Sequence, residues 1–150
     1  MILQNDTKYI MKSLALIFSA CFMTTICFAK IPEKVINAFQ LKYANATNVK
    51  WKNDVIYCTV TFDLMNAKYH ATFDKKGEWL QSTQKLRVNE LPEVIKQSFK
   101  KTKYASWSLV SCFEEYFPRE QPRYHVRAAK GSIRRKDLVF DSQGKIVQGK

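Results

Sequence analysis

Glycine and histidine are scarce in this chain, and their scarcity removes several classes of enzyme. The four glycines stand at positions 77, 131, 144 and 149. They cannot form a glycine-rich phosphate loop or the tight turn that exposes a serine nucleophile. The two histidines, His70 and His125, show no metal-type spacing to each other or to a cysteine. The sequence therefore predicts a non-enzymatic protein with no catalytic residue, no cofactor and no metal site.

Cysteine is also sparse. Two of the four cysteines, Cys21 and Cys27, fall in an N-terminal apolar stretch, which leaves Cys58 and Cys112. An oxidising compartment would permit a disulfide between this remaining pair. The alternative, which we favour, is that both side chains are buried as small apolar groups.

The first 29 residues have the pattern of an export signal. Lys12 precedes an apolar run that continues to Phe28, and Ala29 supplies the small residue expected at a cleavage site. The run is shorter than the roughly 20 residues that a membrane-spanning helix needs. We therefore expect a signal peptide over residues 1–29 and a periplasmic or secreted protein. Three alternatives stay open: a true start at Met11, a lipid anchor at Cys21, and a retained N-terminal segment.

The rest of the chain contains two similar stretches in the same order. The spacing from Tyr57 to Asp74 equals that from Tyr124 to Asp141. A repeated order indicates one supersecondary unit present twice. We therefore predict an α+β fold of two tandem units, residues 30–88 and 89–150, packed together as one compact domain. Each unit would be a helix followed by about four antiparallel strands, with the helices covering one face of the sheet.

Local signals support these elements. Pro32 and Pro92 suit the first turn of a helix, which tolerates proline. The segments 74–77 and 141–144 each begin with aspartate and end with glycine, which predicts hairpin turns. One strand, near residues 57–62, is ambiguous, because either of its two faces could point inward. Either a bulge shifts its register or both of its faces are covered.

The second stretch is six residues longer than the first, between Cys112 and Arg123. Two prolines there predict an extended or turning loop rather than the interior of a strand. Aromatic and arginine side chains dominate binding energies at protein interfaces, and we therefore expect this loop to bind a partner. The alternative is that the loop folds back to cap the core. The candidate binding residues are Phe113, Tyr116 and Phe117 as apolar contacts, with Arg119 and Arg123 as orienting charges.

The chain is strongly basic, with a formal net charge of +12. Such a charge favours anionic partners, although a merely solvated basic surface is the alternative. Nucleic acid is a less favoured partner, because an exported protein seldom meets it. The basic residues cluster at Lys100, Lys101 and Lys103 and again at Arg127, Lys130, Arg134, Arg135 and Lys136.

The ordered motifs resemble one known family. They are Ile31-Pro32-Glu33 with Phe39, Val49-Lys50-Trp51, Tyr57 with Phe62, and Phe73-Asp74 with Gly77 and Trp79, then Leu91-Pro92-Glu93, Tyr124, and Phe140-Asp141 with Gly144. This pattern resembles the PepSY-like family, also described as beta-lactamase-inhibitor-like, of exported Bacteroidetes proteins.

The resemblance implies a location in the periplasm or at the cell surface. It also implies a non-catalytic module that binds an exported protein and is inhibitor-like toward a peptidase or a beta-lactamase. The alternative function is binding of an anionic polymer or lipid surface through the basic face.

Overall fold

The computed structural model describes residues 30–149. The expected signal peptide, with Met11, Cys21 and the cleavage site at Ala29, lies outside the described residues. The helical elements are α2 (Glu33–Lys42), the short turn η1 (Val88–Glu90) and α3 (Glu93–Lys100). The strands are β1 (Thr47–Asn53), β2 (Tyr57–Leu64), β3 (Ala67–Asp74), β4 (Trp79–Leu86), β5 (Ser108–Tyr116), β6 (Arg123–Lys130), β7 (Arg134–Asp141) and β8 (Ile146–Gly149).

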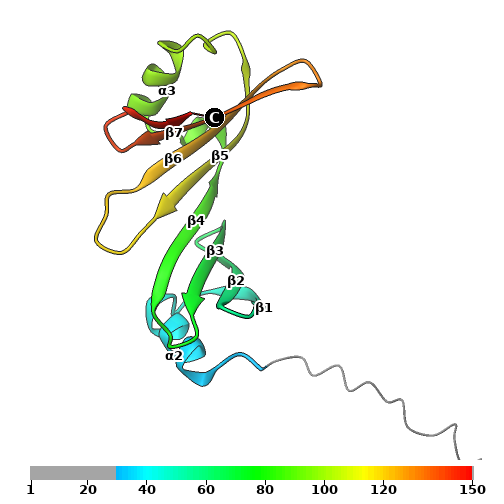
Figure 1. Cartoon of the computed structure of the whole chain (residues 1–150), viewed down its shortest axis with the longest axis vertical. Coiled ribbons are helices and arrows are strands. Elements are labelled where there is room, and N and C mark those ends of the chain that lie inside the picture. Colours follow the sequence, from blue (N-terminus) through cyan, green and yellow to red (C-terminus); the bar gives the residue numbers. More distant parts are fainter. Residues whose placement is uncertain (1–29, 150) are drawn as a thin grey trace, which may run out of the picture.

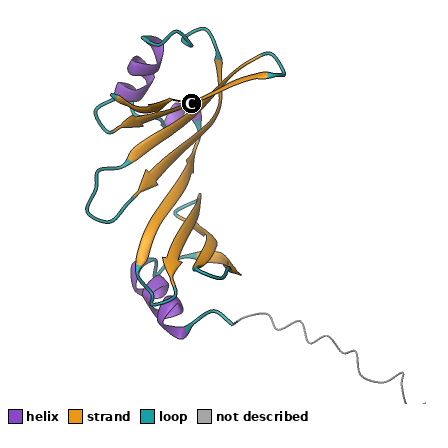
Figure 2. Cartoon of the chain, viewed as in Figure 1, coloured by secondary structure: helices purple, strands orange, loops and turns teal. Residues whose placement is uncertain are grey.

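The strands form one antiparallel sheet in sequential order from β1 to β8. The expected fold class, an α+β protein of two tandem helix-plus-sheet units, is therefore wrong. The described chain is mostly one eight-stranded sheet, with only two short α-helices at opposite ends of the long axis (Figures 1 and 2).

The pairing of β4 with β5 is the reason for this correction. Five residue pairs, from Ser82↔Tyr116 to Leu86↔Cys112, join the two strands without a break in register. Their backbone groups satisfy one another across the middle of the chain, so the sheet has no edge there. Sequence similarity between the two stretches gave no information about this contact.

Each helix begins directly after a proline, as predicted. Pro32 precedes α2 and Pro92 precedes α3, and the carbonyl of each accepts hydrogen bonds from the first turn of its helix. The inward residues of α2 are Val35 and Phe39, and those of α3 are Ile95 and Phe99. Their spacing of four residues places each pair on one side of its helix.

The buried side chains form two clusters, one beneath each helix. The α2 cluster consists of Val35, Phe39, Cys58, Val60, Phe62, Ala71 and Phe73. The α3 cluster consists of Leu86, Leu91, Ile95, Phe99, Cys112, Tyr124, Val126, Ala128, Leu138 and Phe140.

Both clusters lie on the same face of the sheet. On β4, Ser82 bonds to Tyr43, which packs against the α2 cluster, and Leu86 belongs to the α3 cluster. Ser82 and Leu86 are four positions apart on one strand, so their side chains share a face. The opposite face carries neither α2 nor α3, and we call it the helix-free face.

The two predicted turns are confirmed. The Asp74 carboxylate accepts hydrogen bonds from the backbone N–H groups of residues 76 and 78, and Asp141 does the same for residues 143 and 145. Gly77 and Gly144 take the positive φ angles of 93° and 83° that these turns require.

The ambiguous strand is β2, and its inward face is the one with Cys58, Val60 and Phe62. Its register against β3 is continuous from Tyr57↔Asp74 to Leu64↔Ala67. No bulge is therefore present between these two strands. Tyr57 points to the helix-free face and is 45% exposed.

The disulfide considered between Cys58 and Cys112 is not formed. Both thiols are free and buried. Cys58 lies in the α2 cluster on β2, whereas Cys112 lies in the α3 cluster on β5. Two strands, β3 and β4, separate them in the sheet, and a disulfide requires Cα atoms within about 7 Å.

Among residues 30–149, no helix has the length and apolar character that crossing a membrane requires.

Candidate functional site

A row of three side chains crosses the helix-free face over β5, β6 and β7. Phe113 lies directly opposite His125, and His125 lies directly opposite Val139. Directly paired residues on one face of an antiparallel sheet have Cβ atoms about 5 Å apart. The three side chains therefore form a continuous, partly apolar strip, in which Val139 is 8% exposed.

A groove of about 470 Å³ lies along this strip. Its outer lining includes Thr83 from β4 and Ser111 from β5. Volumes of roughly 300 to 1,000 Å³ are typical of ligand pockets. A lining that combines the apolar Phe113 and Val139 with polar side chains suits an apolar group projecting from a ligand or a partner protein.

Four of the polar side chains that line the groove contact one another in two pairs. The His125 Nε2 atom lies 2.6 Å from Oε2 of Glu115. Arg127 donates two hydrogen bonds to Asp137, Nε to Oδ1 at 2.6 Å and a terminal nitrogen to Oδ2 at 3.1 Å. The guanidinium group that hydrogen bonds to Asp137 lowers the pKa of that carboxyl group below its ordinary value. Each of these four side chains therefore already has a partner within the protein.

The predicted partner-binding loop is shorter than expected. Strand β5 continues to Tyr116 and β6 begins at Arg123, so only residues 117–122 form the connection. Half of the extra length extends the two strands and half lengthens the connection between them. Pairing with β4 and β6 satisfies the backbone of residues 113–116, and both prolines fall beyond it.

The predicted binding residues do not lie together. Phe113 lines the groove on the helix-free face. Tyr116 points to the other face, where its hydroxyl donates a hydrogen bond to Oε1 of Gln84 at 3.2 Å. Burial, together with the nearby Glu114 carboxylate, raises the pKa of Tyr116. Tyr116 therefore belongs to the polar contacts between the two clusters and not to the groove.

The remaining three lie near one end of β5 and β6. The guanidinium carbon of Arg123 lies 4.8 Å from the centre of the Phe117 ring, a cation–π contact. Arg123 also forms an ion pair with Glu120 at 2.6 Å. Arg119 is exposed in the connection and has a positive φ of 61°. Arg123 and Phe113 share a face because β5 and β6 pair in regular alternation here.

Sequence reasoning missed His125 and Val139 as members of the site. A signal for His125 was present, because the inward residues Tyr124 and Val126 leave it on the outer face of the same strand. No comparable signal existed for Val139. It lies between two other buried residues, Leu138 and Phe140, and strand alternation is hidden in such a run.

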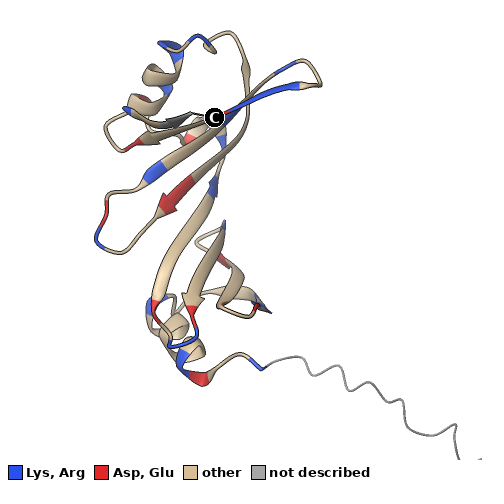
Figure 3. Ribbon diagram, viewed as in Figure 1, with Lys and Arg blue, Asp and Glu red and all other residues tan. Residues whose placement is uncertain are grey.

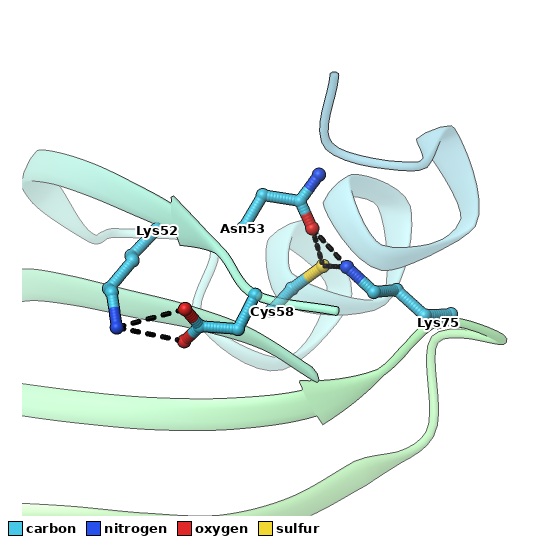
Figure 4. Close-up of polar contacts among 5 residues, drawn as sticks. Lys52, Asn53, Cys58 and Lys75 are labelled. Carbon is cyan, nitrogen blue, oxygen red and sulfur yellow. Dashed lines mark hydrogen bonds and ion pairs between the residues drawn. The ribbon is translucent and has the colours of Figure 1, made fainter. Parts of the chain in front are cut away.

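Other polar groups lie away from the groove. His70 bonds to Thr61 through Nδ1 at 2.9 Å on the neighbouring part of the sheet. The Cys58 thiol donates to Oδ1 of Asn53 at 3.3 Å, and the Lys75 ammonium contacts both (Figure 4). Within residues 30–149, no three His, Cys, Asp or Glu side chains come together as a metal site.

Comparison with known proteins identifies the family. A model of the beta-lactamase-inhibitor-like, PepSY-like family matches residues 52–148. The chain belongs to this family. The match runs from the end of β1 into β8 and includes the whole groove. It confirms the resemblance inferred from the sequence motifs. Among curated proteins, none matches the chain.

Several solved structures share the fold. A BLIP-like protein from Bacteroides fragilis superimposes with a TM-score of 0.76 at 22% identity, over 83% of this chain and 88% of that one. A DUF2874 family protein from Bacteroides ovatus gives a TM-score of 0.76 at 20% identity, over 81% and 87%. A candidate periplasmic protein from Bacteroides eggerthii gives a TM-score of 0.74 at 18% identity, over 81% and 88%.

Proposed function

We propose that this protein is an exported, non-catalytic module that binds another protein through the groove on its helix-free face. The observation that carries the proposal is the paired row of Phe113, His125 and Val139 that lines this groove. Family membership supports an inhibitor-like role toward a peptidase or a beta-lactamase. The candidate periplasmic relative supports an exported location.

The arrangement suits recognition of a projecting loop. An apolar side chain of the partner would cover Phe113 and Val139 and exclude water from them. The hydrogen bond between His125 and Glu115 and the ion pair between Arg127 and Asp137 are already formed without a partner. The charges of Arg127 and Asp137 can therefore orient a partner, but because they are already paired they add little to affinity. The cation–π pair of Arg123 and Phe117 extends the same surface toward the end of β6.

The test is a binding and inhibition screen against purified exported peptidases and beta-lactamases. The variants are Phe113→Ser and, as a matched control, Tyr57→Ser, which removes an aromatic ring from the same face on β2. We expect the native protein to bind at least one target. Phe113→Ser should weaken that binding by about 30-fold, the loss typical of a central interface residue.

Two outcomes contradict the proposal. If no target is bound or inhibited at micromolar protein, the inhibitor-like role is wrong. If Phe113→Ser and Tyr57→Ser bind equally well, the groove is not the binding surface. Circular dichroism of both variants confirms that any loss reflects binding and not unfolding.

A further inference from the structure

The hairpin formed by β6 and β7 concentrates positive charge that the fold does not neutralise. Lys130 lies directly opposite Arg134 in the register of the two strands, and Arg135 and Lys136 follow. Like charges directly opposite on a sheet repel and destabilise the pair. Figure 3 shows the basic residues along this hairpin.

None of these four cations forms an ion pair within residues 30–149, in contrast with Arg123 and Arg127 on β6. The next acidic residue along the hairpin is Asp137, and it already forms an ion pair with Arg127. The Lys136 ammonium lies over the ring of Tyr104, 5.5 Å from the ring centre. The Lys103 ammonium lies over the same ring, also 5.5 Å from its centre. This contact joins the hairpin to the basic segment after α3.

The tip of the hairpin exposes one apolar side chain. Ile133 is 89% exposed in the turn between the two strands. At the preceding Gly131, an added Cβ would meet no atom within 4 Å, so the turn projects away from the rest of the protein. Unpaired cations are attracted to anionic headgroups, and an exposed aliphatic side chain beside them can enter the boundary between headgroups and acyl chains.

A second hairpin with an exposed apolar side chain at its tip shows what distinguishes this one. At the tip between β2 and β3, Met65 is also 89% exposed. Its neighbouring strands carry Asp63 and Lys68, which pair at 3.4 Å. An equally exposed apolar tip therefore occurs in both hairpins, but only the tip at Ile133 is flanked by positive charge alone.

We propose that the β6–β7 hairpin docks on an anionic lipid surface, with Ile133 entering the interface and Lys130, Arg134, Arg135 and Lys136 contacting lipid phosphates. The proposal does not depend on the groove. Phe113→Ser should leave lipid binding unchanged, so the two proposals fail independently.

The experiment is sedimentation of the protein with vesicles of phosphatidylglycerol and phosphatidylcholine, compared with phosphatidylcholine alone, at low and high salt. We expect binding only to the anionic vesicles, with loss as salt rises because exposed charges are screened. Arg134→Ser/Arg135→Ser should lower the partition coefficient about 25-fold, since each cation near an anionic membrane contributes about five-fold. Ile133→Ser should lower it a few-fold.

Matched controls separate this hairpin from general charge. Met65→Ser should bind like the native protein. Lys34→Ser/Lys76→Ser removes two exposed cations near α2 and should change binding less than about two-fold if those residues stay away from the membrane.

Three results would overturn the proposal. The first is absence of binding to anionic vesicles. The second is an equal loss in the Lys34/Lys76 control, which would mean that only net charge matters. The third is heparin retention as strong as vesicle binding combined with no effect of Ile133→Ser, which would assign the hairpin to a soluble polyanion.

Discussion

The α2 and α3 clusters occupy the same face of one sheet but are built from different side chains. Beneath α2, Phe39, Phe62 and Phe73 form a network of ring contacts with neighbouring aromatic residues. Beneath α3, the buried residues are mainly aliphatic, with Leu138 and Ile95 among them. Core chemistry thus changes along a sheet whose backbone pattern continues.

The helix-free face differs between the same two regions. Over β2 and β3 it carries threonines and His70, whereas over β5 to β7 it carries Phe113 and Val139 in the groove. All of these strands pair in the same antiparallel manner. The groove therefore depends on which side chains point outward from β5 to β7, and not on a special backbone. Stability and recognition can be altered separately in such a sheet.

The largest expected difference between the clusters is at their central phenylalanines. Phe62 and Phe140 are both fully buried. The Phe62 ring lies 5.0 Å from Phe39, 4.6 Å from Tyr43 and 5.5 Å from Tyr69, centre to centre. Removing a buried phenylalanine costs about 3–5 kcal/mol. Aromatic pairs add about 0.5–1.5 kcal/mol beyond the buried area.

We therefore expect Phe62→Ala to destabilise the protein by about 5 kcal/mol and Phe140→Ala by about 3 kcal/mol. Urea unfolding measures both, and the leucine variants serve where alanine prevents folding. An equal or larger loss at Phe140 would show that ring contacts do not distinguish the clusters.

The two aspartate–glycine turns provide the next comparison. A Cβ at Gly77 would lie 2.7 Å from the backbone oxygen of Lys34, and one at Gly144 would lie 2.3 Å from Oγ of Ser98. The Lys34 oxygen belongs to the main chain in the first turn of α2 and cannot move aside, whereas the Ser98 hydroxyl can rotate. We expect Gly77→Ala to cost about 3 kcal/mol and Gly144→Ala about 2 kcal/mol.

Second-site variants make this comparison sharper. Ser98→Ala should recover part of the loss in Gly144→Ala, because it removes the clashing atom. Lys34→Ala should recover none of the loss in Gly77→Ala, because the clash is with the main chain. Thermal unfolding of the two glycine variants, each alone and combined with its second-site change, tests both statements. Recovery at Gly77 would contradict the assignment of the clash.

The sequence predicted local structure well because local structure depends on neighbouring residues. Pro32 and Pro92 mark the helix starts, and the Asp74 and Asp141 turns form as expected. The pairing of β4 with β5 could not be predicted, because it depends on contacts between edge strands that leave no local pattern.

The candidate site was predicted only in part. Phe113 was selected as an aromatic residue in an apparent loop and does line the groove, but from within β5. Tyr116 was selected by the same argument and lies on the other face. Because side chains alternate along a strand, an odd number of positions between the two reverses the face. Sequence reasoning treated the segment as a loop, and that alternation was therefore not applied.

A smaller difference between the clusters concerns alkaline pH. Burial raises the pKa of Cys112 to about 11, and burial with the Glu114 carboxylate raises the pKa of Tyr124 to about 12. Both groups belong to the α3 cluster. A group whose pKa is higher in the folded state keeps its proton there, so stability is complete below the unfolded pKa and falls as pH rises toward the folded value.

We therefore expect stability to fall by about 1–2 kcal/mol between pH 8.5 and 10.5, mainly through Cys112. Cys112→Ala should make the dependence on pH less steep across this range, while its stability at pH 7 is lower because a buried atom is lost. Urea unfolding at several pH values measures the slope. An unchanged slope in Cys112→Ala would contradict the assignment to this thiol.

The smallest expected effect is at the ion pair beside the groove. The Arg127 and Asp137 side chains are 48% and 55% exposed, and solvent-exposed pairs contribute about 0–1 kcal/mol. Because Arg127 lowers the pKa of Asp137, the contribution is present above the unfolded value near 3.9 and is lost as pH falls below it. A double-mutant cycle with Asp137→Asn and Arg127→Gln should give a coupling below about 1 kcal/mol at pH 7. A coupling energy well above that value would mean that the pair helps to hold β6 to β7. A small coupling energy would mean that the pair contributes little to stability, so that its charges are free to orient a partner over Phe113 and Val139. Stability and recognition would then depend on different side chains of the same sheet.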